Sequence, residues 1–133
     1  TLDGKPQQDR VDWQPLSEQA ITLALAQNKR VFVDVTADWC ITCKANKFNV
    51  LLRDDVQQAL SAPDVVALRG DWSRPSNTIA SFLRQRGSVA IPFNQIYGPG
   101  LTDGEILSPL LDRSTLLATL AQAGIAPSQG ETK

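Results

Sequence analysis

Alternating apolar and polar stretches along the chain predict a succession of strands and helices. The run Val31–Val35 is apolar at nearly every position, which favours a central strand that is covered on both faces. A second strand is predicted over Val65–Trp72 and a third over Val89–Tyr97, with a short one at Glu105–Leu107. Strands of this length separated by helical segments indicate an α/β fold.

Apolar residues spaced three and four apart predict four helices between and around these strands. The first helix is expected to start at Ser17 or Pro15, the last is capped by Asp112 or Ser114, and Gly124 is a candidate C-cap. The second helix follows the strand at Val31–Val35 and is expected to bend near Asn49. The predicted helices cover residues 17–27, 44–60, 76–86 and 112–124.

The 133 residues form one predicted domain over 15–124, with a linker or N-terminal arm at 1–14 and a flexible tail at 125–133. Hydrophobic residues make up 42% and charged residues 20%, an ordinary globular composition. The net charge of −1 and the scattered lysines and arginines argue against nucleic-acid binding. No apolar run is long enough to insert into a membrane, and we expect a monomer.

The two cysteines, Cys40 and Cys43, are spaced C-x-x-C between a predicted strand and a predicted helix. This placement is typical of a thiol–disulfide redox site, because a helix N-terminus stabilises a thiolate. We expect Cys40 to be the more exposed nucleophile and Cys43 the more buried resolving thiol. Lys44 and Lys47 follow Cys40 at helical spacing and are candidates to favour its thiolate.

A purely structural role for the cysteine pair has less support. A structural zinc site normally needs four ligands, and the chain has two cysteines and no histidine. A structural disulfide between these two cysteines would close too short a loop to add much stability. A module that holds Cu(I) between the two thiolates remains an alternative function. Redox exchange through the pair needs no organic cofactor and no resident metal.

Asp34 interrupts the apolar strand six residues before Cys40. A carboxylate in a central strand is costly unless it is paired or functional. Burial would raise its pKa, and Asp34 would then exchange a proton with Cys43. A backbone-bonded carboxylate at a frayed strand end is the alternative.

Pro92 interrupts the third predicted strand, and it is best explained as a cis proline beside the redox loop. That geometry would leave the backbone of Ile91 free to pair with an extended peptide. Trp39, Ile41 and Thr42 complete the predicted docking surface, although Trp39 is equally consistent with a core aromatic.

The order of elements, with C-x-x-C after the first strand and a proline before the third, resembles the thioredoxin fold: a central mixed sheet flanked by helices on both faces. Asp34, Ala37, Ile91–Pro92 and the stretch Trp39–Lys44 carry this resemblance. Within it, Ala37–Lys44 is similar to the C-terminal periplasmic domain of DsbD-type membrane thiol reductases. The stretch Ile91–Gly100 favours the ScsB branch, which is linked to copper tolerance.

The resemblance implies a protein-disulfide reductase that is a periplasmic domain of an inner-membrane protein. Cys40 would attack, Cys43 would resolve, Asp34 would be the buried acid and Pro92 the cis proline. Electrons would arrive from a transmembrane domain and leave to an N-terminal periplasmic domain or to periplasmic thiol proteins. An isomerase or oxidase on the same fold is the alternative, although the chain lacks the histidine that makes DsbA a strong oxidant.

Overall fold

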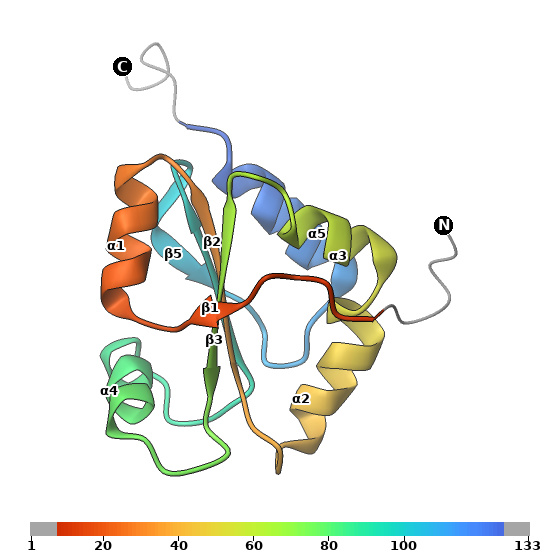
Figure 1. Cartoon of the computed structure of the whole chain (residues 1–133), viewed down its shortest axis with the longest axis vertical. Helices are drawn as coiled ribbons and strands as arrows, with labels where there is room; N and C mark the ends of the chain where they lie inside the picture. Colours follow the sequence, from red (N-terminus) through yellow and green to blue (C-terminus); the bar gives the residue numbers. More distant parts are fainter. Residues whose placement is uncertain (1–7, 127–133) are drawn as a thin grey trace.

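A mixed sheet of five strands forms the centre of the molecule, with helices on both of its faces (Figure 1). The computed structural model describes residues 8–126. The strand order is β1-β3-β2-β4-β5, in which β1, β3 and β2 run parallel while β4 and β5 are antiparallel to their neighbours. The predicted class, a mixed sheet between two helical layers, is confirmed.

Strand β2 lies in the middle of the sheet and is buried along nearly its whole length. It is hydrogen-bonded to β3 on one edge and to β4 on the other. Its apolar residues alternate between the two faces, as expected for a strand that both helical layers cover. The strands are β1 Gln14–Pro15, β2 Arg30–Thr36, β3 Val65–Asp71, β4 Phe93–Gly98 and β5 Leu101–Ile106.

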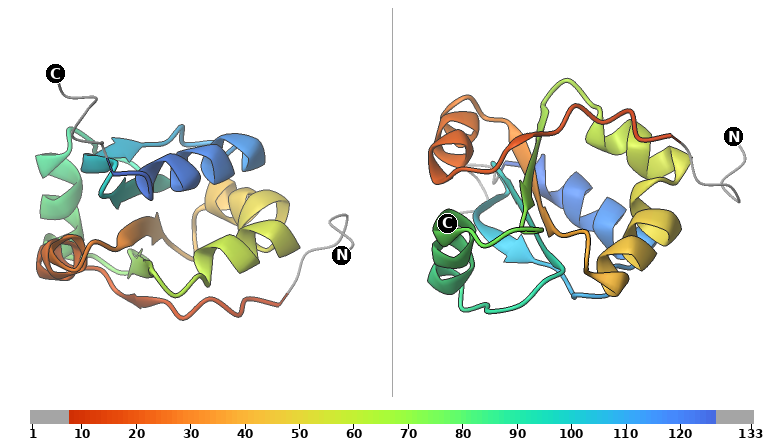
Figure 2. Two further views of the ribbon diagram at one scale, coloured as in Figure 1. Left: turned by 90° about the horizontal axis from the view of Figure 1, so that it is seen from above. Right: turned by 60° about the horizontal axis from the view of Figure 1, so that its bottom comes forward.

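Two helices, α1 and α4, cover one face of the sheet, and the remaining helical segments cover the other, as both views in Figure 2 show. Hydroxyl or carboxylate side chains of Ser17, Ser76 and Asp112 accept the N-terminal amides of α1, α4 and α5. The helical segments are α1 Glu18–Ala26, α2 Ile41–Asn46, the π-helical turn η1 Lys47–Leu51, α3 Asp54–Leu60, α4 Asn77–Gln85 and α5 Arg113–Ala123.

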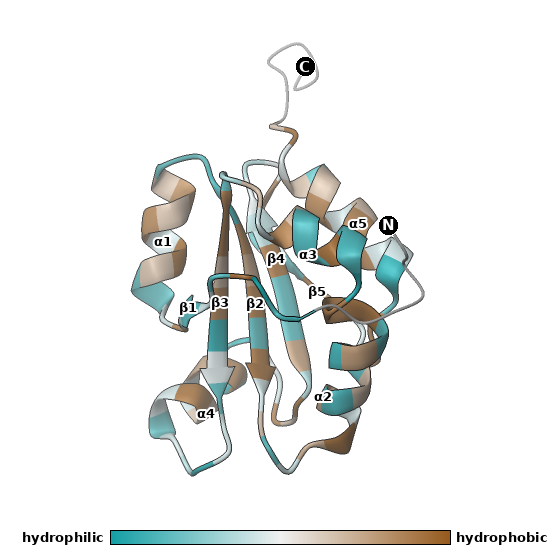
Figure 3. Ribbon diagram, turned by 45° about the vertical axis from the view of Figure 1, so that its right-hand side comes forward, coloured by the Kyte–Doolittle hydropathy of each residue, from teal (hydrophilic) through white to brown (hydrophobic). Residues whose placement is uncertain are grey.

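The two faces of the sheet hold separate hydrophobic cores. Figure 3 shows hydrophobic residues along much of β2 and hydrophilic ones on the outward side of α3. Phe32 is fully buried in the core under α3 and α5, whereas Val31 and Val33 are fully buried in the core under α1 and α4. This alternation fixes which side of the sheet each residue of β2 faces.

The helix predicted over residues 44–60 is divided into three segments. It begins earlier than predicted, at Ile41, because Cys40 occupies the N-cap. The π-helical turn η1 lies where the bend near Asn49 was expected, and Arg53 then adopts extended backbone (φ −74°, ψ 147°). Two aspartates in the first turn of α3 favour a new helix start there.

The third and fourth strands also differ from prediction. Residues 89–92 lie outside the sheet, and β4 begins at Phe93, because Pro92 has no N–H for a strand ladder. Strand β5 is longer than the predicted Glu105–Leu107 and starts at Leu101. Gly104 lies within it at φ 83°, in the left-handed region that glycine tolerates, where the pairing of β5 with β4 is irregular.

The segment predicted as an arm packs against the domain from Asp9 onward. Val11 is buried, and the ring of Trp13 contacts Phe32 with 6.0 Å between ring centroids. Gln14 and Pro15 form β1 and pair with β3. Of the predicted tail, only residues 125 and 126 are among those described.

Arg86 ties α1, α4 and β4 together. Its guanidinium donates to both carboxylate oxygens of Glu18, at 2.6 and 2.7 Å, and to the hydroxyl of Tyr97 at 2.9 Å. The same group lies over the ring of Phe82, 3.5 Å from its centroid. The hydrogen bond from Arg86 holds the pKa of Glu18 below its ordinary value of 4.5.

We predict that this ion pair makes stability depend on acid pH. Because the pKa of Glu18 is lowered on folding, its contribution is complete above the unfolded value of 4.5 and is lost as the pH falls through the lower folded value. Glu18→Gln should remove this part of the pH dependence in urea titrations at about pH 6 and about pH 3. Glu105→Gln, on the exposed side of β5, is the control. Identical pH dependence in the two variants would contradict the prediction.

Candidate functional site: the Cys40–Cys43 pair

Cys40 and Cys43 form a disulfide at the N-terminus of α2, with their Cα atoms 5.2 Å apart. The chain leaves β2 at Thr36 and turns through Ala37, whose carbonyl accepts the N–H of Cys40. Cys40 is the N-cap residue, and its Sγ accepts the backbone N–H of Cys43 at 3.1 Å. This N–H and the positive end of the helix favour negative charge on Cys40 more than on Cys43.

The prediction that Cys40 is the more exposed cysteine is wrong, because both residues are 6% exposed. Ala37 packs with the pair, and Trp72 and Ile91 cover it from β3 and the loop before β4. The asymmetry between the two sulfurs is therefore one of hydrogen bonding, not of burial.

The Ile91–Pro92 peptide bond is cis, the geometry that the sequence favours. Ile91 contacts the cluster that holds both cysteines. Within residues 8–126, neither the N–H nor the carbonyl of Ile91 makes a hydrogen bond. Its backbone is thus available for an extended peptide beside the disulfide.

An apolar groove of about 520 Å³ adjoins the disulfide. Trp39, which is 60% exposed, closes one side and donates from Nε1 to the carbonyl of Trp72 at 3.1 Å. Of its two possible places, the core or the surface, Trp39 therefore takes the surface. Ile41 and Thr42 are also exposed, whereas Ile91 is half-buried. The groove is lined by Trp39, Trp72, Ser73, Arg74, Pro75, Val89, Ala90 and Ile91.

Asp34 is buried, at 4% exposure, on the sheet face that carries α2. Its Oδ2 accepts from Nε of Arg69 at 2.9 Å, and its Oδ1 accepts from Nδ2 of Asn94 at 2.8 Å. Register explains this arrangement, because Asp34 is directly opposite Arg69 on β3 and Asn94 on β4. Asp34 is therefore a paired carboxylate within the strand, not a frayed end.

Arg69 and Asn94 are functional candidates that sequence reasoning missed. Arg69 also contacts the Asp9 carboxylate at 3.5 Å and lies over the ring of Trp13, 3.8 Å from its centroid. The available signal was the presence of polar residues within two largely apolar strands, but only the register shows that Arg69 and Asn94 meet at Asp34.

A second cavity, of about 190 Å³, reaches Cys43 from the side of β3. Lys44 and Lys47 line it together with Cys43, and Lys44 also lies one helical turn beyond Cys40, as its spacing predicted. Bonds from the side chain and backbone of Ser73 hold the pKa of Asp71 below its ordinary value. The lining residues are Thr36, Ala37, Asp38, Cys43, Lys44, Lys47, Arg69 and Asp71.

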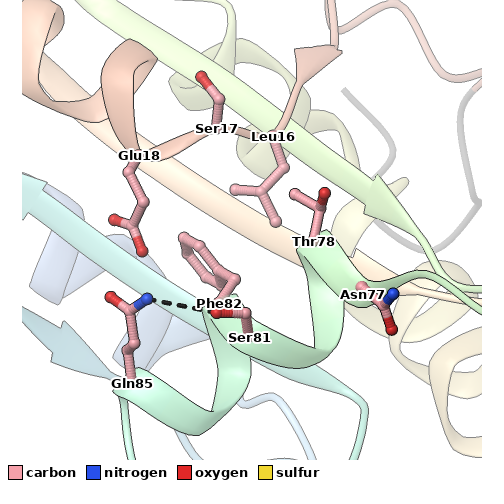
Figure 4. Close-up of a pocket in the computed structure, with 8 residues that line it drawn as sticks. All are labelled: Leu16, Ser17, Glu18, Asn77, Thr78, Ser81, Phe82 and Gln85. Atoms are coloured by element: carbon pink, nitrogen blue, oxygen red, sulfur yellow. Dashed lines mark hydrogen bonds between the residues drawn. The ribbon is translucent and has the colours of Figure 1, made fainter.

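A further pocket lies away from the cysteines. The pocket between α1 and α4 in Figure 4 is lined by residues such as Glu18, Phe82 and Gln85 and holds none of the predicted site residues. Across residues 8–126, no three His, Cys, Asp or Glu side chains gather as metal ligands would. In the same range, no helix combines the length and apolar character that crossing a bilayer requires.

The chain is similar in sequence to curated proteins. The thiol:disulfide interchange protein DsbD of Yersinia pestis is 31% identical over 98 residues, which are 68% of this chain. Its counterpart in Yersinia enterocolitica is 31% identical over 77 residues, which are 58% of the chain. The chain spans 16% and 13%, respectively, of the length of these curated relatives.

Solved structures agree on the fold. The reduced C-terminal domain of DsbD from Neisseria meningitidis superposes with a TM-score of 0.60 at 21% identity, over 83% of this chain and 99% of that one. A thioredoxin from Thermus thermophilus superposes with a TM-score of 0.61 at 24% identity, over 83% of this chain and 84% of that one.

The family model described as thioredoxin-like matches residues 12–99, which include Asp34, both cysteines and Pro92. The sheet order, the cysteine pair at a helix start and the similarity to DsbD together support thiol–disulfide exchange as the chemistry of this site. The chain belongs to the thioredoxin-like family.

Proposed function

We propose that this domain relays reducing equivalents through Cys40 and Cys43, from a transmembrane domain of the same membrane protein to a periplasmic partner domain. The main support is the position of the Cys40 sulfur, at the N-cap of α2 and beside the unpaired backbone of Ile91. The similarity to DsbD, a thiol:disulfide interchange protein, supports the setting.

The exchange proceeds in two substitutions at sulfur. The thiolate of Cys40 attacks a partner disulfide, so that a Cys40–partner bond forms and the other partner sulfur leaves as a thiolate. The thiolate of Cys43 then attacks Cys40 Sγ and expels the partner's second sulfur. Two electrons have passed to the partner, and the Cys40–Cys43 disulfide is regenerated for reduction by the donor.

The partner is an extended segment that lies along Ile91. Its backbone pairs with the free N–H and carbonyl of that residue, and an apolar side chain next to its cysteine enters the groove lined by Trp39, Trp72 and Val89. Such a segment brings its sulfur to Cys40 without unfolding either domain. Ile41 and Thr42 are exposed and complete the contact surface.

Asp34 supports the exchange from beneath the pair. Both of its oxygens accept hydrogen bonds, so taking a proton from Cys43 would weaken its pairing with Arg69 or Asn94. We therefore assign Asp34 mainly to fixing the local charge, with proton transfer as its secondary role.

The direction of the relay and its branch belong to the same proposal. The pair Ile41-Thr42 between the cysteines, and the absence of any histidine from the sequence, favour a reductant over an oxidase or isomerase. The stretch Ile91–Gly100 favours the ScsB branch, with its link to copper tolerance, and a periplasmic location.

We predict that Cys40→Ala abolishes reduction of a protein disulfide such as insulin, because the remaining sulfur, that of Cys43, lacks the N-cap position from which Cys40 attacks. Cys43→Ala should instead accumulate the mixed disulfide, because the resolving thiol is gone. Mass spectrometry of the non-reduced product distinguishes the two variants. Full exchange activity in Cys40→Ala would refute the assignment.

We predict that the equilibrium potential of the Cys40–Cys43 couple lies near that of thioredoxin, at about −270 mV, as a reductant requires. Equilibration with glutathione buffers, followed by alkylation of free thiols, measures it. A potential near that of DsbA, about −120 mV, would replace the relay with the oxidase alternative.

We predict that Val89→Asp weakens reduction of protein substrates, because a charge would enter the apolar groove. Loss of the valine contact that docking of the partner would bury corresponds to a roughly fivefold to tenfold rise in KM. Leu23→Asp, on an exposed part of α1, is the matched control. Reduction of hydroxyethyl disulfide, which is too small to use the groove, should stay unchanged in both variants. An equal effect on both substrates would contradict the docking role.

A further inference from the structure

The cavity beside Cys43 contains more positive than negative side chains. Lys44, Lys47 and Arg69 line it together with the carboxylates of Asp38 and Asp71. Asp34 is not part of the lining, and its own charge is balanced by Arg69. Trp72 and Ile91, which cover the cysteines elsewhere, carry no charge. The titratable and charged side chains next to Cys43 are therefore those that line this cavity.

Among the three cations, Lys47 has the helical position that faces Cys43. The N–H of Lys47 bonds to the carbonyl of Cys43, so the two residues are one helical turn apart. Side chains at this spacing share a helix face, and the Cα–Cβ bond of the later residue tilts back toward the earlier one. Lys44 is adjacent to Cys43 in sequence, so it points to a different side of the helix.

The charge of Lys47 is also not committed elsewhere. Arg69 is paired with Asp34 and Asp9, at 2.9 and 3.5 Å. Within residues 8–126, the ammonium group of Lys47 makes no ion pair or hydrogen bond, although the residue is half-buried. An unpaired cation in a partly desolvated cavity interacts strongly with any negative charge that develops there.

We propose that Lys47 is a positioning residue that stabilises the thiolate of Cys43 in the step that releases the partner. This inference rests on the proposed function, in which Cys43 resolves the mixed disulfide. While Cys40 is bonded to the partner, the Cys43 thiol gives its proton to solvent, with Asp34 as the secondary acceptor, and the resulting thiolate faces the Lys47 ammonium. It then forms the S–S bond to Cys40, and the partner's sulfur leaves with the electron pair.

The test measures the titration of Cys43 directly. In Cys40→Ala, Cys43 is the only cysteine of the chain, so its pKa is readable from the rate of iodoacetamide alkylation against pH. Adding Lys47→Gln should raise this pKa by about half a unit to one unit, whereas Lys47→Arg should restore it. Lys29→Gln, at the opposite end of β2 from the redox loop, removes the same charge as a control.

A second measurement follows the release step itself. In the chain with both cysteines, Lys47→Gln should slow decay of the mixed disulfide by about twofold to threefold. A higher pKa of Cys43 lowers the fraction of thiolate, and the greater nucleophilicity of that thiolate offsets only part of this loss. An unchanged Cys43 pKa in Lys47→Gln, or an equal change in Lys29→Gln, would overturn the proposal. Because alkylation needs no exchange partner, this outcome is independent of whether Cys40→Ala loses exchange activity. Circular dichroism establishes that each variant is folded.

Discussion

The burial of β2 on both faces and both edges is the constraint on which the site depends. β2 ends at Thr36, where the chain leaves the sheet and continues directly into the turn that carries Cys40. Because β2 is buried, the carboxylate of Asp34 would be costly without hydrogen-bond partners. The neighbouring strands provide these partners, Arg69 and Asn94, at the same register. The redox loop and the paired carboxylate of Asp34 are therefore two results of one strand placement.

The features that depend on local pattern were predictable from the sequence. The apolar run at Val31–Val35, the cysteine spacing and Pro92 are each local signals, and they predicted the central strand, a helix next to the cysteines and the cis bond. A bend near Asn49 was expected, but the break at Arg53 was not predictable in the same way, since apolar residues continue on both sides of it, from Leu52 to Val56 and Leu60.

The missed features depend on contacts between distant segments. The pairing of Asp34 with Arg69 requires the register of β2 against β3, which the sequence does not contain. The equal burial of the two cysteines results from Trp72 and Ile91, which approach from other parts of the chain. In the folded domain, an apolar groove adjoins the disulfide on one side and a charged cavity reaches Cys43 on the other. In the proposed mechanism, the surface that selects a partner is therefore separate from the surface that controls ionisation of Cys43.

The two-residue strand β1 has a consequence beyond its size. Gln14 and Pro15 occupy the outer edge of β3, and Leu16 adds a further backbone bond to Arg69. Proline at such an edge offers no N–H to an incoming strand. A chain that starts at its first helix would lack β1, and the exposed edge of β3 would then be open to strand pairing between copies. A soluble minimal fragment therefore has to begin upstream of the first helix.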